Sequence, residues 1–374
     1  MPLTLTDEQR MLRDSVQAFL GARAPIAHLR RLRDTADPRG YSHELWREFG
    51  VQGYSATLVP KADGGLGLGV IEAGLISEQL GHTLTPSPFL STAVLAGWAI
   101  SQAGSPAQRA RLLPAIAAAE TIIALAVDEQ GKHRPSALAT TATHEGAGFR
   151  LDGSKLFVLD GHVAGTLIVA ARSSADALTL FLVDAAAAGV AIERTVMVDA
   201  HNAARVRLDG VRVGADAVLG AVGAGAAWLE QLLDVGRVVV AAELLGVADE
   251  AFTRTLAYLR ERRQFDRPIG EFQALQHRAA ELYCDIEMTR ALVLKALQAV
   301  AAGPAQARLL ASQAKAHACT TASCAVREGV QLHGGMGMTD ASDIGLYMKR
   351  ARVLQELFGD ARFHADRVAT LRGY

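Results

Sequence analysis

The segment RERRQFDRPIGEFQALQHRAAEL, from Arg260 to Leu282, joins two stretches of helical periodicity through a short turn that contains Pro268 and Gly270. Four arginines crowd this turn: Arg260, Arg262, Arg263 and Arg267. Because a planar guanidinium offers paired donors to phosphate oxygens, the turn favours an anionic ligand, and Phe265 adds an aromatic face for stacking. The alternative is a solvated cationic helix end, since arginines near a helix C-terminus are stabilised by the helix dipole.

A second segment, QLHGGMGMTD from Gln331 to Asp340, lies between two later helical patterns. Paired glycines let the backbone approach a ligand closely and expose N–H groups to phosphate. Taken alone, the segment is also typical of an ordinary turn between helices.

Outward from these two segments, the chain divides into three parts. Apolar residues recur at helical spacing up to about residue 120, and about five helices are expected there. Short β-like runs such as TLIVAAR follow, separated by Gly, Asp and Ser turns, which favours an antiparallel barrel or sandwich. Long helical patterns then return and favour an up-and-down bundle. They cover 226–262, 271–301, 305–331, 340–351 and 357–372. The expected domains are 1–120, 121–220 and 221–374.

Charge and composition exclude several classes of function. The 374 residues carry 38 basic and 39 acidic side chains, so the net charge of −1 gives no electrostatic reason to expect nucleic acid or an anionic membrane as partner. The longest apolar stretches are too short to span a bilayer, so no membrane insertion is expected. The N-terminus has no apolar signal core, which predicts a cytoplasmic protein.

Cysteine usage points the same way. The three cysteines, Cys284, Cys319 and Cys324, form no disulfide framework, which fits a reducing compartment. On a continuous helix, Cys319 and Cys324 are five residues apart and point in different directions, so no metal site is expected.

The two segments together carry a resemblance to a known family. QF-x-RPIG-x-FQ-x-x-QH, followed about 55 residues later by Q-x-HGGMG-x-T, resembles the acyl-CoA dehydrogenase family of FAD flavoproteins, and the likeness covers nearly the whole chain. It implies an α+β fold with a helical N-terminal domain, an antiparallel β-barrel or sandwich in the middle and a C-terminal four-helix bundle. In the family reaction a glutamate removes the α-proton of an acyl-CoA thioester, and a hydride passes from the β-carbon to flavin N5.

The resemblance also implies where FAD would be held. In the family the cofactor lies at a dimer interface. By resemblance, seven residues contact the adenosine and diphosphate end of a flavin seated mainly in the neighbouring subunit: Arg262, Gln264, Phe265, Gln273, Gln331, Gly334 and Gly335. Asp266 departs from the pattern, because the family usually has Gly there.

The part of the pattern that faces the flavin ring is altered. The family's Thr-Glu-Pro-Gly-Ala-Gly-Ser-Asp stretch is replaced at 128–135 by DEQGKHRP. The family's Trp-x-Thr beside the flavin corresponds to Phe157-Val158-Leu159. Phe157 keeps an aromatic ring, whereas Leu159 has no hydroxyl to donate.

The positions of the catalytic base are altered as well. By resemblance they are Phe358, which precedes Gly359, and Gly236, which precedes Arg237, and neither is a carboxylate. Glu243 is the candidate substitute. It shares the helical face of Gly236 but lies about 10 Å further along the axis. The alternative interpretation of Glu243 is a helix carboxylate paired with a nearby Arg or Lys.

Three functions follow from this pattern. The first is an FAD-dependent acyl-CoA dehydrogenase with an unusual base, working as a homo-oligomer. The second is a non-catalytic subunit of a hetero-oligomer, which completes the FAD site of a second acyl-CoA dehydrogenase-like chain, as in family members acting on steroid side chains. The third is other flavin chemistry, such as nitroalkane oxidation, for which no residue argues. Electron-transferring flavoprotein is the acceptor that the family implies.

Overall fold

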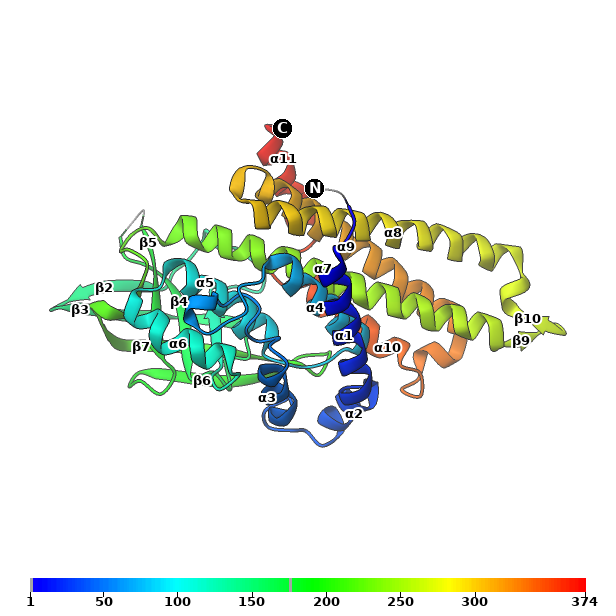
Figure 1. Cartoon of the computed structure of the whole chain (residues 1–374), viewed down its shortest axis with the longest axis horizontal. Coiled ribbons are helices and arrows are strands. Elements are labelled where there is room, and N and C mark those ends of the chain that lie inside the picture. Colours follow the sequence, from blue (N-terminus) through cyan, green and yellow to red (C-terminus); the bar gives the residue numbers. More distant parts are fainter. Residues whose placement is uncertain (1–2, 175–176) are drawn as a thin grey trace. The chain divides into compact units, whose positions relative to one another are not determined.

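The computed structural model describes residues 3–174 and 177–374, and their packing forms two compact units (Figure 1). The first unit contains the residues up to Arg30, Val70–Thr85 and Arg237–Tyr374. The second contains Arg31–Gly69 and Pro86–Gly236. The division of the sequence into three successive domains stays a prediction, since packing groups the early helices with both units.

The second unit is built on an eight-stranded sheet with the order β6-β7-β3-β2-β4-β5-β8, and β1 pairs with β4. The strands are β1 Ile123–Ala126, β2 Thr141–Glu145, β3 Gly148–Leu159, β4 Thr166–Arg172, β5 Leu178–Asp184, β6 Val190–Val196, β7 Asn202–Gly214 and β8 Val218–Leu219. The path is open, with β6 and β8 as its ends, so within the described residues the sheet does not close into a barrel.

Most strand pairs are antiparallel, as the short β-like runs predicted, but β4 pairs in parallel with β1 and, at Thr141 and Arg172, with β2. A parallel pair requires a long connection between its two strands. For the β1–β4 pair, β2 and β3 lie within that connection. The apolar run at 123–126 gave no indication of a parallel pair. The sheet core is apolar, and the Phe149 and Phe181 rings meet edge to face at 5.1 Å.

Helices and turns complete the second unit. They are α3 His43–Val51, η1 Lys61–Asp63, the π-helical η2 Phe89–Ala96, α5 Gly97–Ala103, α6 Pro106–Ala117 and η3 Ala215–Ala217. Ser105 caps α6, because its side chain accepts from Gln108 N while the Gln108 side chain accepts from Ser105 N. Gln108 also donates to the carbonyls of Asp216 and Val218, which fixes α6 against the chain at β8.

Long helices dominate the first unit. The elements are α1 Asp7–Arg23, α2 Ile26–Asp34, α4 Val70–Thr83, α7 Gly225–Glu261, β9 Arg263–Gln264, β10 Arg267–Pro268, η4 Ile269–Glu271, α8 Gln273–Ala302, α9 Pro304–His333, η5 Gly334–Met338, α10 Ile344–Glu356 and α11 Ala361–Arg372. Of these, α2 and α7 each cross the boundary between the two units. Figure 1 shows α8 and α9 as long neighbouring helices. Residues 3–120 contain six α-helices, where about five were expected.

Helices α4 and α7 touch through their backbones. A Cβ atom added to Gly246 would lie 1.9 Å from the Glu78 carbonyl oxygen, and one added to Gly81 would lie 2.3 Å from the Glu243 carbonyl oxygen. Real Cβ contacts are much longer, and backbone atoms cannot move aside as a flexible side chain can. Both positions therefore require glycine for the two helices to approach this closely.

We expect Gly246→Ala to lower the free energy of unfolding by about 3 kcal/mol or more, because overpacking against a backbone forces the helices apart. The matched control is Gly345→Ala, since Gly345 lies in α10 with no atom within 4 Å of its Cβ position. There alanine should stabilise by up to about 1 kcal/mol through its helix propensity. Urea unfolding of both variants measures the difference, and equal effects would contradict the contact.

Candidate active site

The arginine-rich segment forms a small hairpin of β9 and β10 between α7 and α8 (Figure 1). Its two turn residues, Phe265 and Asp266, have φ values of 53° and 65°. Asp tolerates this left-handed conformation better than most residues, which explains how it replaces the family's Gly. The Phe265 ring is 85% exposed, and the Arg267 guanidinium lies 4.1 Å from the centre of the Phe272 ring.

The glycine-rich segment follows α9. Gly334 has φ 60° and ψ −141°, a conformation that side chains rarely adopt, and a Cβ at Gly334 or Gly335 would meet no atom within 4 Å. The backbone there is open to an approaching ligand. The His333 ring stacks on Tyr258 of α7 at 4.3 Å, so the end of α9 lies beside the last turn of α7 that leads into the hairpin.

The structure thus brings the arginine-rich and glycine-rich segments together at one end of the first unit, which we call the helical unit. Arg262, Gln264, Gln273 and Gln331 are exposed there as hydrogen-bond donors, together with the exposed Phe265 ring and the open glycine backbone. Guanidinium and amide donors suit phosphate oxygens, and an exposed ring suits a base. This donor set fits the adenosine and diphosphate end of FAD.

The altered loop at 128–135 is closed on itself. The Asp128 carboxylate lies 2.9 Å from His133 Nδ1 through both of its oxygens and also accepts from Arg134 N at 3.4 Å. The Asp128 carbonyl accepts from Leu156 N at 2.7 Å. The loop is therefore fixed both internally and to β3.

Phe157 lies at an irregularity in β3. The pairing with β7 shifts between Lys155 and Val158, and Phe157 has φ 52° with 47% of its surface exposed. A bulge of this kind re-aims a side chain, and here it turns an aromatic ring outward. Leu159 ends the strand opposite Ala203.

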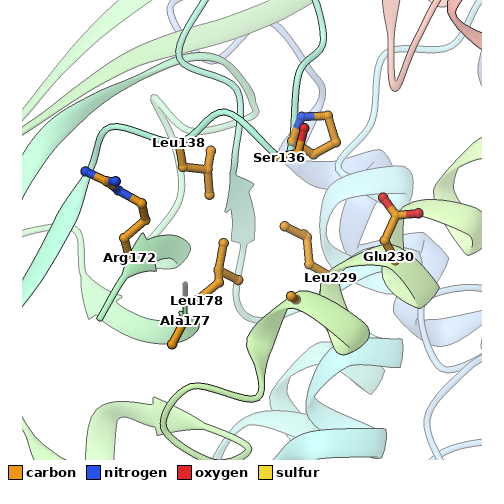
Figure 2. Close-up of a pocket in the computed structure, with 9 residues that line it drawn as sticks. Ser136, Leu138, Arg172, Ala177, Leu178, Leu229 and Glu230 are labelled. Carbon is orange, nitrogen blue, oxygen red and sulfur yellow. The ribbon is translucent and has the colours of Figure 1, made fainter. Parts of the chain in front are cut away.

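A cavity of about 310 Å³ lies in the second unit (Figure 2). Its lining comes from the loop after residue 134, the end of β4, the start of β5 with the residue before it, and the first turns of α7: Pro135, Ser136, Leu138, Arg172, Ala177, Leu178, Ala226, Leu229 and Glu230. Figure 2 shows Leu138, Leu178 and Leu229 around one space, with Arg172 and Glu230 on opposite sides of it. This site was not predicted from the sequence, where its one signal is an arginine at the end of an apolar β-like run.

Neither of the two predicted base positions carries a carboxylate. Gly236 lies within α7, and Phe358 is 9% exposed with φ 56°. The Phe358 carbonyl accepts from His364 Nε2 at 3.1 Å and from Arg237 Nε at 3.4 Å. A left-handed turn at 358–359 is thus held by buried side chains.

Glu243 is bound to an arginine. Its Oε1 accepts from Arg350 Nε at 2.8 Å and from Arg350 Nη2 at 2.5 Å, and both side chains are nearly buried. This agrees with the alternative interpretation of Glu243 as a paired helix carboxylate. Its role as catalytic base stays a prediction, and the ion pair opposes that role because the charged form is stabilised where it stands.

Neither a metal centre nor a membrane span is found in residues 3–174 and 177–374. Among these residues, no three His, Cys, Asp or Glu side chains gather as metal ligands would. Nor does any helix in the described ranges combine the length and apolar character needed to cross a bilayer.

Comparisons with known proteins identify the family. Residues 6–120 match "Acyl-CoA dehydrogenase, N-terminal domain", and residues 223–370 match "Acyl-CoA dehydrogenase, C-terminal domain". The chain is 30% identical to the acyl-CoA dehydrogenase FadE27 of Mycobacterium tuberculosis over 98% of both chains.

Solved structures agree. The chain is similar to a variant of the Tcur3481-Tcur3483 steroid ACAD, with 32% identity, TM-score 0.90, and 99% and 98% of the two chains covered. It is also similar to the ChsE4-ChsE5 complex from Mycobacterium tuberculosis, with 29% identity, TM-score 0.91 and full coverage of both chains. The chain belongs to the acyl-CoA dehydrogenase family, whose members use FAD for α,β-dehydrogenation of acyl-CoA thioesters.

We expect Glu243→Gln to lower the free energy of unfolding by about 3–5 kcal/mol, because it takes the carboxylate charge away from the buried Arg350 guanidinium. The matched control is Glu145→Gln, since Glu145 pairs with Arg212 and the two side chains are 43% and 76% exposed. An exposed pair contributes about 0.5 kcal/mol or less. Urea unfolding measures both. Unchanged stability with lost dehydrogenation would instead favour Glu243 as the base.

Proposed function

We propose that this chain takes part in α,β-dehydrogenation of an acyl-CoA with FAD held across an interface between two family subunits. The observation that carries the proposal is the meeting of the hairpin and the Gly334 segment at one end of the helical unit. Arg262, Gln264, Gln273 and Gln331 would donate to the diphosphate, Gly334 and Gly335 would admit it to the backbone, and Phe265 would contact the adenosine. FAD, when bound, supplies the hydride acceptor.

The cavity in the second unit is the proposed site for the acyl-CoA. Leu138, Leu178 and Leu229 give it an apolar lining, and Arg172 at its edge suits the phosphates of coenzyme A. Phe157 and the 128–135 loop would form the side that faces the flavin ring. Electron-transferring flavoprotein stays the predicted electron acceptor.

A second candidate is favoured by the base positions. The two predicted base positions hold Gly236 and Phe358, neither of which is a carboxylate. The predicted substitute, Glu243, is bound to Arg350 in an ion pair. Two similar solved structures are named as pairs of proteins, one of them a steroid acyl-CoA dehydrogenase. A hetero-oligomer would let a partner subunit supply the glutamate while this chain completes the partner's FAD site.

The FAD content and oligomeric mass of the chain purified alone separate the two candidates. About one FAD per chain in a homotetramer is expected if the chain works by itself. Little FAD, restored to about half occupancy by co-expression with a glutamate-bearing family chain, is expected for the hetero-oligomer. Absence of FAD under both conditions would contradict the proposed function.

We expect Arg262→Gln to weaken FAD binding by about tenfold or more, because a charge-assisted hydrogen bond to phosphate contributes about 1.5–3 kcal/mol. Arg150→Gln is the control, since Arg150 lies exposed on β3 beside Asp152. FAD release followed by flavin fluorescence measures the difference. Equal release from both variants would remove Arg262 from the proposed site.

A further inference from the structure

A buried lysine, Lys155, contacts the start of the altered 128–135 loop. Lys155 on β3 is fully buried, and its Nζ lies 2.7 Å from Glu129 Oε1, 2.6 Å from the Ala170 carbonyl and 3.2 Å from the Val127 carbonyl. An ammonium has three N–H donors, and all three are used. Burial lowers the pKa of Lys155, whereas the hydrogen bond and charge of Glu129 oppose that shift.

Glu129 extends this contact to the far end of its own loop. Its carboxylate accepts from the backbone N–H groups of Ala139 and Thr140, ten and eleven residues further along the chain. Burial raises the pKa of Glu129, but the hydrogen bond and charge of Lys155, together with these N–H groups, bring it below its ordinary value. One ionised carboxylate therefore closes the loop that carries Pro135, Ser136 and Leu138 of the cavity.

The same lysine also fixes the bulge that exposes Phe157. Lys155 binds the Val127 carbonyl, and the next residue, Leu156, donates its N–H to the Asp128 carbonyl at 2.7 Å. The shift in strand pairing begins at Lys155, and Phe157, two residues further on, has a positive φ. The start of the loop and the bulge in β3 are thus held side by side by contacts around one ammonium.

A third wall of the cavity depends on the same group. The Ala170 carbonyl that Lys155 binds is two residues before Arg172, and Arg172 N donates to the Thr140 carbonyl at 2.9 Å. Lys155 therefore contacts, directly or through Glu129, the loop, the β3 bulge and the end of β4. The loop and the end of β4 line the cavity together with the start of β5 and α7. The β3 bulge carries the outward Phe157 ring.

We propose that Lys155 is a positioning residue, whose ammonium, acting with Glu129, holds the cavity loop and the Phe157 bulge in one fixed arrangement. The proposal rests on the proposed function for the role of the cavity, but its geometry is independent of that role. Removing either partner leaves the other charge buried, which lowers the stability of the protein. The hydrogen bonds that are lost lie in the loop, the β3 bulge and the end of β4, so the largest loosening is expected in these segments.

Hydrogen exchange of the full chain, read by mass spectrometry, tests the proposal. In Lys155→Met, peptides covering 130–140 and 155–158 are expected to exchange about tenfold faster or more, while α8 and α9 keep wild-type rates. In Glu129→Gln, the 130–140 peptides alone should loosen, because Lys155 keeps the Val127 and Ala170 carbonyls. This second variant also serves if Lys155→Met fails to fold.

The matched control is Lys315→Met, which makes the same substitution at another fully buried lysine. Lys315 Nζ binds the carbonyls of Leu354, Gln355 and Gly359 in the first unit. It should loosen 354–360 and leave 130–140 at wild-type rates. Wild-type exchange over 130–140 in both Lys155→Met and Glu129→Gln would overturn the proposal. So would uniform loosening of the whole chain in both, which indicates a general loss of stability.

Titration with coenzyme A itself separates this proposal from the proposed function. If the wild-type FAD-loaded protein binds coenzyme A, Lys155→Met should weaken that binding about tenfold, because the loop and the end of β4 that line the cavity are no longer held in place. Unchanged affinity beside a loosened loop would overturn the positioning role. If the wild-type protein does not bind coenzyme A, the assignment of the cavity fails, and the exchange experiment still decides whether Lys155 holds the loop and the bulge.

Discussion

The helical unit depends on the backbone contact between α4 and α7. Because Gly81 and Gly246 bring the two helices together without side chains between them, polar groups on both helices come within reach of their neighbours. Arg290 of α8 binds Glu78 of α4 at 2.7 Å, and the same guanidinium reaches Asp249 of α7 at 3.2 Å. Burial raises the pKa of Glu78, and the charge of Arg290 opposes that shift.

The same contact places α10. The Tyr347 hydroxyl donates to the His82 carbonyl at the end of α4, and Arg350, one turn further along α10, binds Glu243 of α7. Burial raises the pKa of Tyr347, which keeps the hydroxyl protonated as a donor. The one carboxylate that the sequence offered as a substitute base is thus part of the packing of three helices. A residue used in this way is poorly suited to exchange protons with a substrate.

Much of the fold was readable from the sequence, because Gly, Pro and capping residues mark the ends of helices and strands locally. The helices after residue 225 were predicted within a few residues of their ends. The open path of the sheet and the parallel β1–β4 pair were not, since strand order depends on contacts far apart in the chain. For the same reason Arg172 and Leu229 were missed, and the partner of Glu243 was predicted by type but not as Arg350.

The turn at Phe358 and Gly359 has a consequence for how such a chain can change. A phenylalanine in the left-handed region costs about 1–3 kcal/mol, so the conformation persists only because its surroundings impose it. Lys315 binds the Gly359 carbonyl, and His364 binds the Phe358 carbonyl, so main-chain contacts impose the shape. Because these contacts are made to main-chain carbonyls, the shape of the turn does not require a particular side chain at residue 358. An acidic group can therefore be introduced there by substitution at a single site, with no rebuilding of the loop.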